Sequence, residues 1–251
     1  MKEVTINELS FWLKDTPMII HINPVGLAWL GENNKQRYSS LDIILNDIQN
    51  NGGNIAVPTY SYSYTKDEVY DVYNTPSALN EVSEFLRKEN IDKRTADANF
   101  SYLMFGSSFS SKHLKVLNYS TFGKDSLIDE VYNKDGYLGV IGDALEYLTE
   151  VHYLEKRLDV SYRFDKIFKG ASINADGEII HNQLTYFCRD LKSNYSGSLL
   201  RLKEDIRLEG IVKKWKLKEH NIIFEVVKIQ ELYTFIKEKL LNNAKYLQNN
   251  Q

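Results

Sequence analysis

The chain has 251 residues, a hydrophobic content of 43% and 17 tyrosines, enough for one large domain with a sizeable core. A net charge of −3 and a pI near 6.0 argue against a nucleic-acid binder, which usually carries a basic field. The single cysteine, Cys188, excludes an internal disulfide, and no stretch resembles a signal peptide or the roughly 20 apolar residues of a membrane span, so we expect a cytoplasmic protein.

Helical and strand patterns alternate through most of the chain. Apolar residues recur at helical spacing in three segments, Ile6–Leu13, Ser39–Asn50 and Asn80–Lys88. Short apolar runs predict buried strands over Pro17–Ile22, Asn54–Val57 and Tyr137–Ile141, and Ala98–Phe105 as a further buried element. Strands that alternate with helices of this length predict an α/β fold, layered α/β/α around a central mixed sheet.

A cluster of polar turn residues, Lys192–Ser198, predicts a boundary in the last third of the chain. We expect residues 1–195 to form the main domain and residues 196–251 to form a small C-terminal α+β extension packed on it. Within the extension the pattern predicts two helices joined by a hairpin: Leu199–Leu208, Ile211–Leu217 with Ile222–Val227, and Ile229–Leu247.

The stretch LTEVHYLEKR, residues 148–157, places a histidine among glutamates and aromatic residues on a predicted helix. Thr149, His152 and Glu155 fall near one face, while the apolar residues of the stretch point the opposite way. Asp143 and Glu146 resemble a capping box that begins this helix. Because the apolar face alone can anchor the helix, the polar face is free to face a cleft, where His152 is either a base or a packed ring.

General catalytic motifs are lacking. The glycines at 136, 139 and 142 do not form a dinucleotide fingerprint, and the sequence contains no Walker loop, no HExxH and no GxSxG. The other four histidines show no metal-ligand spacing, so we expect no metal cofactor: they are His21, His113, His181 and His220.

Five motifs in order resemble the aminoglycoside N3-acetyltransferase family, from about Pro17 to Leu191. The motif that carries the candidate base is T-x-x-H-x-x-E (Thr149, His152, Glu155), after a strand that ends in Gly142. The others are VPTYSYS with NTPS, KRTADANFSYLMFG, FGKDSLIDEVYNKDGYLGVIG and SYRFDKIFKG. The resemblance implies the family's layered α/β fold and a CoA-dependent N-acyltransferase, which makes residues 1–195 an acyltransferase domain.

Three departures bear on the substrate. Asp97 stands where the family's R-S-x-H-P block has a histidine, and Ser63 stands where antibiotic-modifying members have an acid. Those members also have a glutamate downstream of the histidine, and the corresponding region of this chain, near Cys188–Asp190, has no glutamate. The pattern is closer to members that acylate nucleotide-linked amino sugars, which often have an aspartate in this block and an RDL like Arg189–Leu191.

The resemblance implies a role for each of several residues. His152 is the expected general base, Thr149 lies one helical turn before it, and the carboxylate that orients the ring is Asp97, Asp190 or Glu155. Acyl-CoA is the expected co-substrate, and its pyrophosphate is expected on the backbone N–H groups of the turn Asn23–Gly26. The expected cofactor-binding residues are Asn23, Pro24, Val25, Gly26, Ser101 and Ser126, and the expected substrate-binding residues are Tyr60, Tyr62, Tyr64, Asp71, Arg94 and Arg163.

The favoured function is an N-acyltransferase that acts on a dTDP- or UDP-linked amino-deoxysugar in O-antigen, capsule or other surface-glycan biosynthesis. No covalent nucleophile is required, since the amine can attack the thioester directly. One alternative is an aminoglycoside 3-N-acetyltransferase, and another is a catalytically silent protein that binds CoA or sugar. The expected partners are acyl-CoA and the amino sugar, with no nucleic acid and no membrane. The sequence leaves open whether the protein forms a homo-oligomer.

Overall fold

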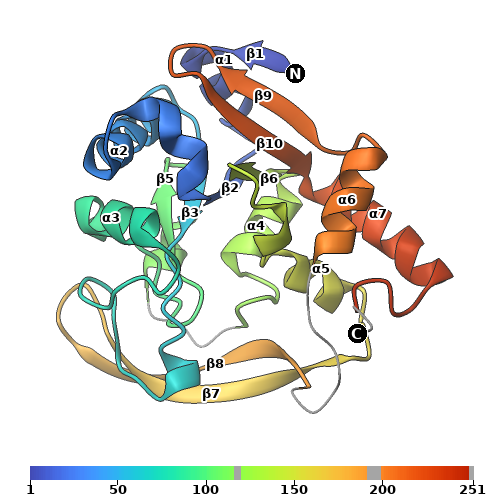
Figure 1. Cartoon of the computed structure of the whole chain (residues 1–251). Coiled ribbons are helices and arrows are strands. Elements are labelled where there is room, and N and C mark those ends of the chain that lie inside the picture. The colour runs from blue at the N-terminus through green and yellow to red at the C-terminus, as the bar shows by residue number, and fades with distance from the viewer. Residues whose placement is uncertain (116–119, 191–198, 249–251) are drawn as a thin grey trace.

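The computed structural model describes residues 1–115, 120–190 and 199–248. A seven-stranded mixed sheet runs through the molecule, with helices on both sides (Figure 1). In spatial order its strands are β1 (Lys2–Val4), β9 (Lys213–Leu217), β10 (Ile222–Lys228), β6 (Tyr137–Ile141), β2 (Met18–Ile22), β3 (Ile55–Pro58) and β5 (Tyr102–Phe105).

Strands β6, β2 and β3 form a parallel centre, because β2 pairs in parallel with both neighbours. Strands β10 and β5 close this centre on its two sides and run antiparallel to it. The carboxyl ends of the three parallel strands therefore meet at one edge of the sheet. In open α/β sheets ligands bind outside this edge.

Side chains of alternate residues along each strand cover opposite faces of the sheet. Met18, Ile20 and Ile22 pack in the cluster that includes helices α1 (Ile6–Trp12), α2 (Asn34–Asn50) and α3 (Glu81–Glu89). Ile19, between them, packs in the opposite cluster. That second layer contains helices α4 (Leu127–Asn133), α5 (Val151–Arg157), α6 (Leu200–Leu208) and α7 (Ile229–Asn242). The predicted layered fold with a central mixed sheet is confirmed.

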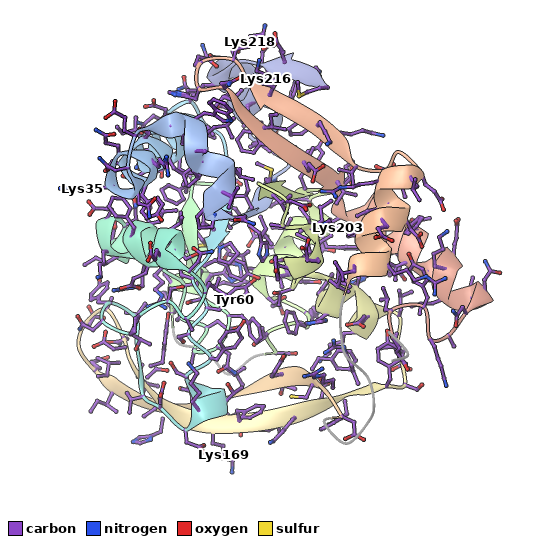
Figure 2. The ribbon with its side chains drawn as sticks, viewed as in Figure 1. Lys35, Tyr60, Lys169, Lys203, Lys216 and Lys218 are labelled. Atoms are coloured by element: carbon purple, nitrogen blue, oxygen red, sulfur yellow. The ribbon has the colours of Figure 1, made fainter. Side chains whose placement is uncertain are left out.

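A second sheet, which the sequence patterns do not predict, consists of β4 (Tyr70–Asp71), β7 (Arg163–Ile173) and β8 (Ile179–Arg189). Its long hairpin crosses the lower part of the view in Figure 1. Only two of the eleven side chains of β7 are buried, so the strand lacks the apolar alternation that sequence reasoning uses. An aromatic chain joins the two sheets: Tyr60, labelled in Figure 2, packs 5.0 Å from Phe100, which packs 5.0 Å from Tyr186 of β8.

The elements predicted for the C-terminal segment are present, but their placement differs from a small unit packed on the outside. β9 and β10 belong to the central sheet, and β10 forms five register pairs with β6. Ladder hydrogen bonds to a buried strand satisfy the backbone of β10, which drives this insertion. Helix α7 ends at Asn242, before the predicted Leu247. The boundary residues Lys192–Ser198 lie outside the described residues.

Five short 3-10 helices connect these elements: η1 (Pro24–Leu30), η2 (Tyr64–Lys66), η3 (Ile91–Lys93), η4 (Ser111–Leu114) and η5 (Leu145–Tyr147). Two elements begin at residues other than those predicted. The element predicted over Ala98–Phe105 is a strand only from Tyr102, and α2 begins at Asn34, five residues before the predicted Ser39. The side chain of Asn33 accepts a hydrogen bond from the N–H of Gln36 and caps α2.

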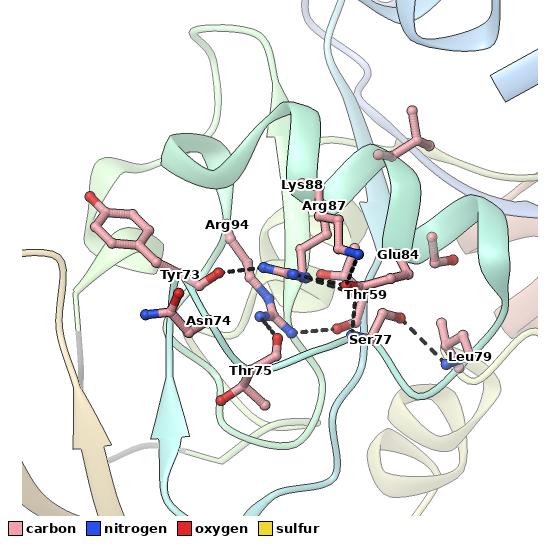
Figure 3. A network of polar contacts seen from close by, with 12 residues as sticks. Thr59, Tyr73, Asn74, Thr75, Ser77, Leu79, Glu84, Arg87, Lys88 and Arg94 are labelled. Carbon is pink, nitrogen blue, oxygen red and sulfur yellow. Dashed lines mark hydrogen bonds and ion pairs between the residues drawn. The ribbon is translucent and has the colours of Figure 1, made fainter. Parts of the chain in front are cut away.

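We expect acid to remove part of the stability through Glu84 of α3, which Figure 3 shows beside Arg87. Burial alone would raise the pKa of Glu84, but hydrogen bonds from Arg87 and the Ser77 N–H lower it to about 2. Because the folded-state pKa lies below the unfolded value of about 4.3, this stabilisation is present above roughly pH 4.3 and is lost towards pH 2. Urea unfolding between these limits should show a smaller loss for Glu84→Gln than for the native protein. The exposed Glu89→Gln is the matched control, and an equal loss in both variants would contradict the prediction.

Candidate active site

A cavity of about 480 Å³ opens outside the carboxyl ends of β2, β3 and β6. Its walls come from the ends of these strands, from the start of α3 and from the segment that leads into α5. The lining residues are His21, Ile22, Asn23, Pro24, Val57, Pro58, Tyr60, Tyr62, Leu79, Asn80, Ser83, Ala144, Glu146, Tyr147, Leu148, Thr149, His152 and Leu199. The parallel strands of the sheet thus bring segments separated by more than a hundred residues to one site.

His152 lies on α5 and lines this cavity. Its Nδ1 is 2.7 Å from Oε2 of Glu155, three residues further along the helix. The Glu155 carboxylate can only accept, so Nδ1 of His152 is the donor in this contact and Nε2 is the nitrogen available to accept a proton. The Arg163 Nη2 lies 3.5 Å from Nε2, which is consistent with an accepting nitrogen there. This is the arrangement that a general base requires.

Glu155 is fully buried and is held on three sides. The Nε of Arg163 lies 2.7 Å from its Oε2, and the Tyr162 hydroxyl donates to its Oε1 at 2.8 Å. Burial alone would raise the pKa of Glu155, but the hydrogen bond from His152 and the charge of Arg163 lower it. Glu155 therefore stays ionised and orients the His152 ring. Arg163, predicted to bind substrate, supports the carboxylate beside the base.

We expect Glu155→Gln to lower turnover about 10–100-fold, since a neutral amide orients the imidazole poorly and does not stabilise the imidazolium. The reaction measured is the acetyl-CoA-dependent acetylation of an amine, followed by the release of the CoA thiol. Asp190→Asn is the matched control, because Asp190 was an equal candidate for this role and lies exposed after β8. A larger loss from Asp190→Asn than from Glu155→Gln would show that the wrong carboxylate was chosen.

The segment between β6 and α5 forms the mouth of the cavity. Thr149 lines it, and its hydroxyl donates to the Tyr147 carbonyl at 3.3 Å. The capping box predicted from Asp143 and Glu146 is wrong, because α5 begins after Glu150 and has no side-chain cap. Both acids instead bind Lys203 of α6, at 2.8 and 3.0 Å. These ion pairs fix the mouth against α6.

Two of the predicted tyrosines contribute to the cavity wall. Tyr60 is fully buried and its hydroxyl donates to Glu150 at 3.1 Å. Tyr62 has a φ of 58°, a strained conformation for an aromatic residue, and such strain collects at functional sites. Burial, followed by the neighbouring Tyr186 and Glu150, raises the pKa of Tyr62 to about 12. Both phenols therefore stay protonated and can donate hydrogen bonds.

The turn predicted to hold the pyrophosphate of CoA lies beside the cavity, directly after β2. Asn23 and Pro24 line the cavity, whereas Val25 and Gly26 line a neighbouring hollow of about 620 Å³. The N–H groups of Val25 and Gly26 already donate to Asn23, to its side chain at 3.1 Å and to its carbonyl at 2.9 Å. The expectation that these N–H groups are open is corrected. Gly26 packs so closely on Gly142 that an added Cβ would lie 2.5 Å from its nitrogen.

Arg94 does not line the cavity, which corrects its prediction as a substrate-binding residue. Arg94 is 1% exposed, and its guanidinium donates to the carbonyls of Thr59, at 2.9 Å, and of Thr75 (Figure 3). It also donates to the hydroxyl of Ser101 at 3.1 Å. Ser101, predicted to bind the cofactor, donates to the Thr59 carbonyl at 2.8 Å and is not among the residues that line the cavity. Arg94 fixes the loop after β3 to the strand β5.

Four other predicted residues form hydrogen bonds within the protein. Asp97 accepts from the N–H groups of Asn99 and Phe100 and from the Thr121 hydroxyl. Asp71 accepts from two N–H groups of its own turn, and Ser126 caps α4. The Tyr64 hydroxyl shares a hydrogen bond of 2.6 Å with Ser172 of β7. None of the four is among the residues that line the cavity.

Sequence reasoning missed a second histidine in the cavity. His21, on β2, lines it, and its Nε2 is 2.9 Å from Oε2 of the fully buried Glu150. Burial alone would raise the pKa of Glu150, but the charge and hydrogen bond of His21 lower it. The strand alternation offered a signal, because His21 falls on the same face as Ile19, towards α5. No local pattern could reveal the partner, which lies 129 residues away.

Comparisons with known proteins show the family and the fold of this chain. A family model described as aminoglycoside 3-N-acetyltransferase matches residues 43–240, and the chain belongs to this family. Among curated proteins no relative matches. Family membership confirms the predicted class of enzyme, an acyltransferase. The predicted resemblance to this family is thus confirmed, whereas the closer likeness to members that acylate nucleotide-linked amino sugars is not shown.

Solved structures show the same fold at low sequence identity. Aminoglycoside acetyltransferase AAC(3)-Xa has a TM-score of 0.68 and 12% identity, over 99% of this chain and 95% of that one. AAC-VIa bound to sisomicin has a TM-score of 0.69 and 14% identity, over 97% and 99%. AAC-IIIb in a binary complex with CoASH has a TM-score of 0.64 and 12% identity, over 96% and 97%.

No helix among residues 1–115, 120–190 and 199–248 is long and apolar enough to cross a membrane. Within the same residues, no group of three or more histidine, cysteine, aspartate or glutamate side chains could hold a metal ion.

Proposed function

We propose that this protein transfers an acetyl group from acetyl-CoA to an amine of an aminoglycoside, by direct attack of the amine on the thioester. The observation that carries the proposal is the His152–Glu155 pair in the wall of a cavity at the carboxyl ends of the parallel strands. Family membership supports an aminoglycoside as the acceptor over the nucleotide-linked amino sugar that the motif departures favour.

The chemistry needs a base, and the residues of this cavity supply it. As the amine nitrogen bonds to the thioester carbon, Nε2 of His152 accepts its proton and can return it to the CoA sulfur when the carbon–sulfur bond breaks. Glu155 stabilises the imidazolium that exists between these two events. Burial raises the pKa of the Cys188 thiol, so this residue is a poor nucleophile and a covalent acyl-enzyme is not needed.

Acetyl-CoA is the donor in this proposal because the family transfers acetyl groups and a protein of similar fold is known in complex with CoASH. Its thioester must reach Nε2 of His152. Asn23 and Pro24, which line the same cavity, remain candidates to contact the cofactor.

A second candidate acceptor is a nucleotide-linked amino-deoxysugar. Among the described residues that line the cavity, Glu146 is the one carboxylate, and it is paired with Lys203 at 3.0 Å. A polycationic drug needs several carboxylates when its ammonium groups lose water. Tyr62 and Tyr147 in the wall instead offer aromatic surface to a nucleoside base.

Kinetics with a single donor separate the two acceptors. With acetyl-CoA, we expect kcat/KM for sisomicin to exceed that for a dTDP-linked amino-dideoxysugar by at least about tenfold, a difference that one or two specific contacts can supply. Mass spectrometry of the product identifies the acetylated amine. His152→Ala is the control for uncatalysed transfer. A higher kcat/KM for the nucleotide sugar would show that the nucleotide sugar, and not the aminoglycoside, is the acceptor.

A further inference from the structure

His21 and Glu150 form a second imidazole–carboxylate pair in the same cavity as His152 and Glu155. Nε2 of His21 lies 2.9 and 3.1 Å from the two oxygens of Glu150. Hydroxyls of Tyr60 and Tyr102 each donate to Oε1 of Glu150 at 3.1 Å. With three donors and a lowered pKa, Glu150 is a carboxylate, so Nε2 of His21 carries a proton.

The other nitrogen of His21 is left for a ligand. Nδ1 forms no hydrogen bond with any residue that the structure describes, and the ring lines the cavity. The charged and titratable groups around it are Glu150 beneath the ring, Tyr60 from the loop after β3, Tyr102 from β5, and Tyr62, Glu146 and His152 in the wall. Because Glu150 holds the ring through Nε2, Nδ1 is the nitrogen of His21 that is available to accept a proton in the cavity.

An amine substrate requires two deprotonations, and one base can perform only one of them at a time. A sugar amine near pH 7 is largely an ammonium ion, which has no lone pair for attack. It must lose one proton before it bonds to the thioester carbon and a second proton once it has done so. His152 accounts for the second proton only.

We propose that His21 is the residue that accepts the first proton, through Nδ1, and so converts the bound ammonium into the attacking amine. The inference rests on the proposed function. The nitrogen then uses its lone pair to bond to the thioester carbon, and His152 takes the second proton and delivers it to the departing thiolate. Acetyl-CoA and R–NH3⁺ thus give the amide, CoASH and one proton, which His21 releases to solvent.

The test compares the pH dependence of His21→Gln with that of the native enzyme, with acetyl-CoA and sisomicin. A glutamine amide can keep the hydrogen bond to Glu150 but cannot accept a proton. At neutral pH we expect kcat/KM to fall about 10–100-fold, and the loss to shrink as pH rises towards 9, because the substrate then arrives as a free amine. His152→Ala should show no such recovery. The matched control is His113→Gln, whose ring is also buried and 2.7 Å from a carboxylate, Glu130, but does not line the cavity.

A measurement on the native protein covers the case in which His21→Gln does not fold. In ¹⁵N-labelled enzyme, we expect the His21 Nδ1 signal to be that of an unprotonated nitrogen and to move when sisomicin is added with CoASH. A His21→Gln profile parallel to the native one, or an unchanged Nδ1 signal in the ternary mixture, overturns the role of His21 and leaves His152 as base. A native enzyme that acetylates neither sisomicin nor a nucleotide-linked amino sugar overturns the proposed function, and this inference with it.

Discussion

His152→Ala should lower kcat about 10²–10⁴-fold, the usual contribution of a general base. Glu155 holds the His152 ring through Nδ1 at 2.7 Å, and alanine provides no proton acceptor at the position of Nε2. The loss should appear in kcat and kcat/KM alike, because the interaction is made mainly in the transition state. Turnover of acetyl-CoA with sisomicin measures it.

Binding of CoA gives the control for this variant. Because the imidazole acts on the amine and not on the nucleotide portion of CoA, we expect the dissociation constant of CoA to change less than about twofold. His181→Ala, an exposed histidine of β8, should leave both quantities unaltered. Native turnover in His152→Ala, or an equal loss in His181→Ala, would rule out His152 as the base.

Arg94→Ala should destabilise the protein by about 3–5 kcal/mol, as expected when one member of a buried polar network is removed. The guanidinium is 1% exposed and satisfies carbonyls of the loop after β3 as well as the Ser101 hydroxyl. Alanine leaves these buried acceptors without a donor. Urea unfolding should therefore show a lower midpoint, with no specific rise in KM for the acceptor once the variant is folded.

Two further arginine variants sharpen this result. Arg94→Lys keeps the charge but loses the planar fork, so we expect most of the stability loss to remain. Arg201→Ala removes an arginine of α6 whose side chain is 56% exposed and should cost less than about 1 kcal/mol. Native stability in Arg94→Ala together with a raised KM would restore the role in substrate binding that the sequence predicted.

Local periodicity was sufficient for the layers of this fold. The apolar spacing of α2 and α3 and the short buried runs of β2, β3 and β6 are properties of single segments, so they predicted the elements and the mixed α/β sheet. The hairpin β7–β8 escaped prediction because few of its residues are buried and they carry little apolar alternation. For β9 and β10 the pattern gave the hairpin but not its place in the sheet.

The sequence by itself offered Glu155 as one of three candidate partners of His152, because a spacing of three residues places two side chains on the same side of a helix, and the structure shows the contact at 2.7 Å. The sequence did not determine which polar residues face the cavity. Motif resemblance placed Arg94 at the substrate, whereas the fold buries it among backbone carbonyls. Nor could the sequence reveal the contact between His21 and Glu150, which are 129 residues apart. That contact forms only because β2 lies beside β6 and α5 packs on the face of the sheet where His21 lies. Contacts within one helix turn follow from helix geometry, but contacts between distant segments exist only after the strands have paired and the layers have packed.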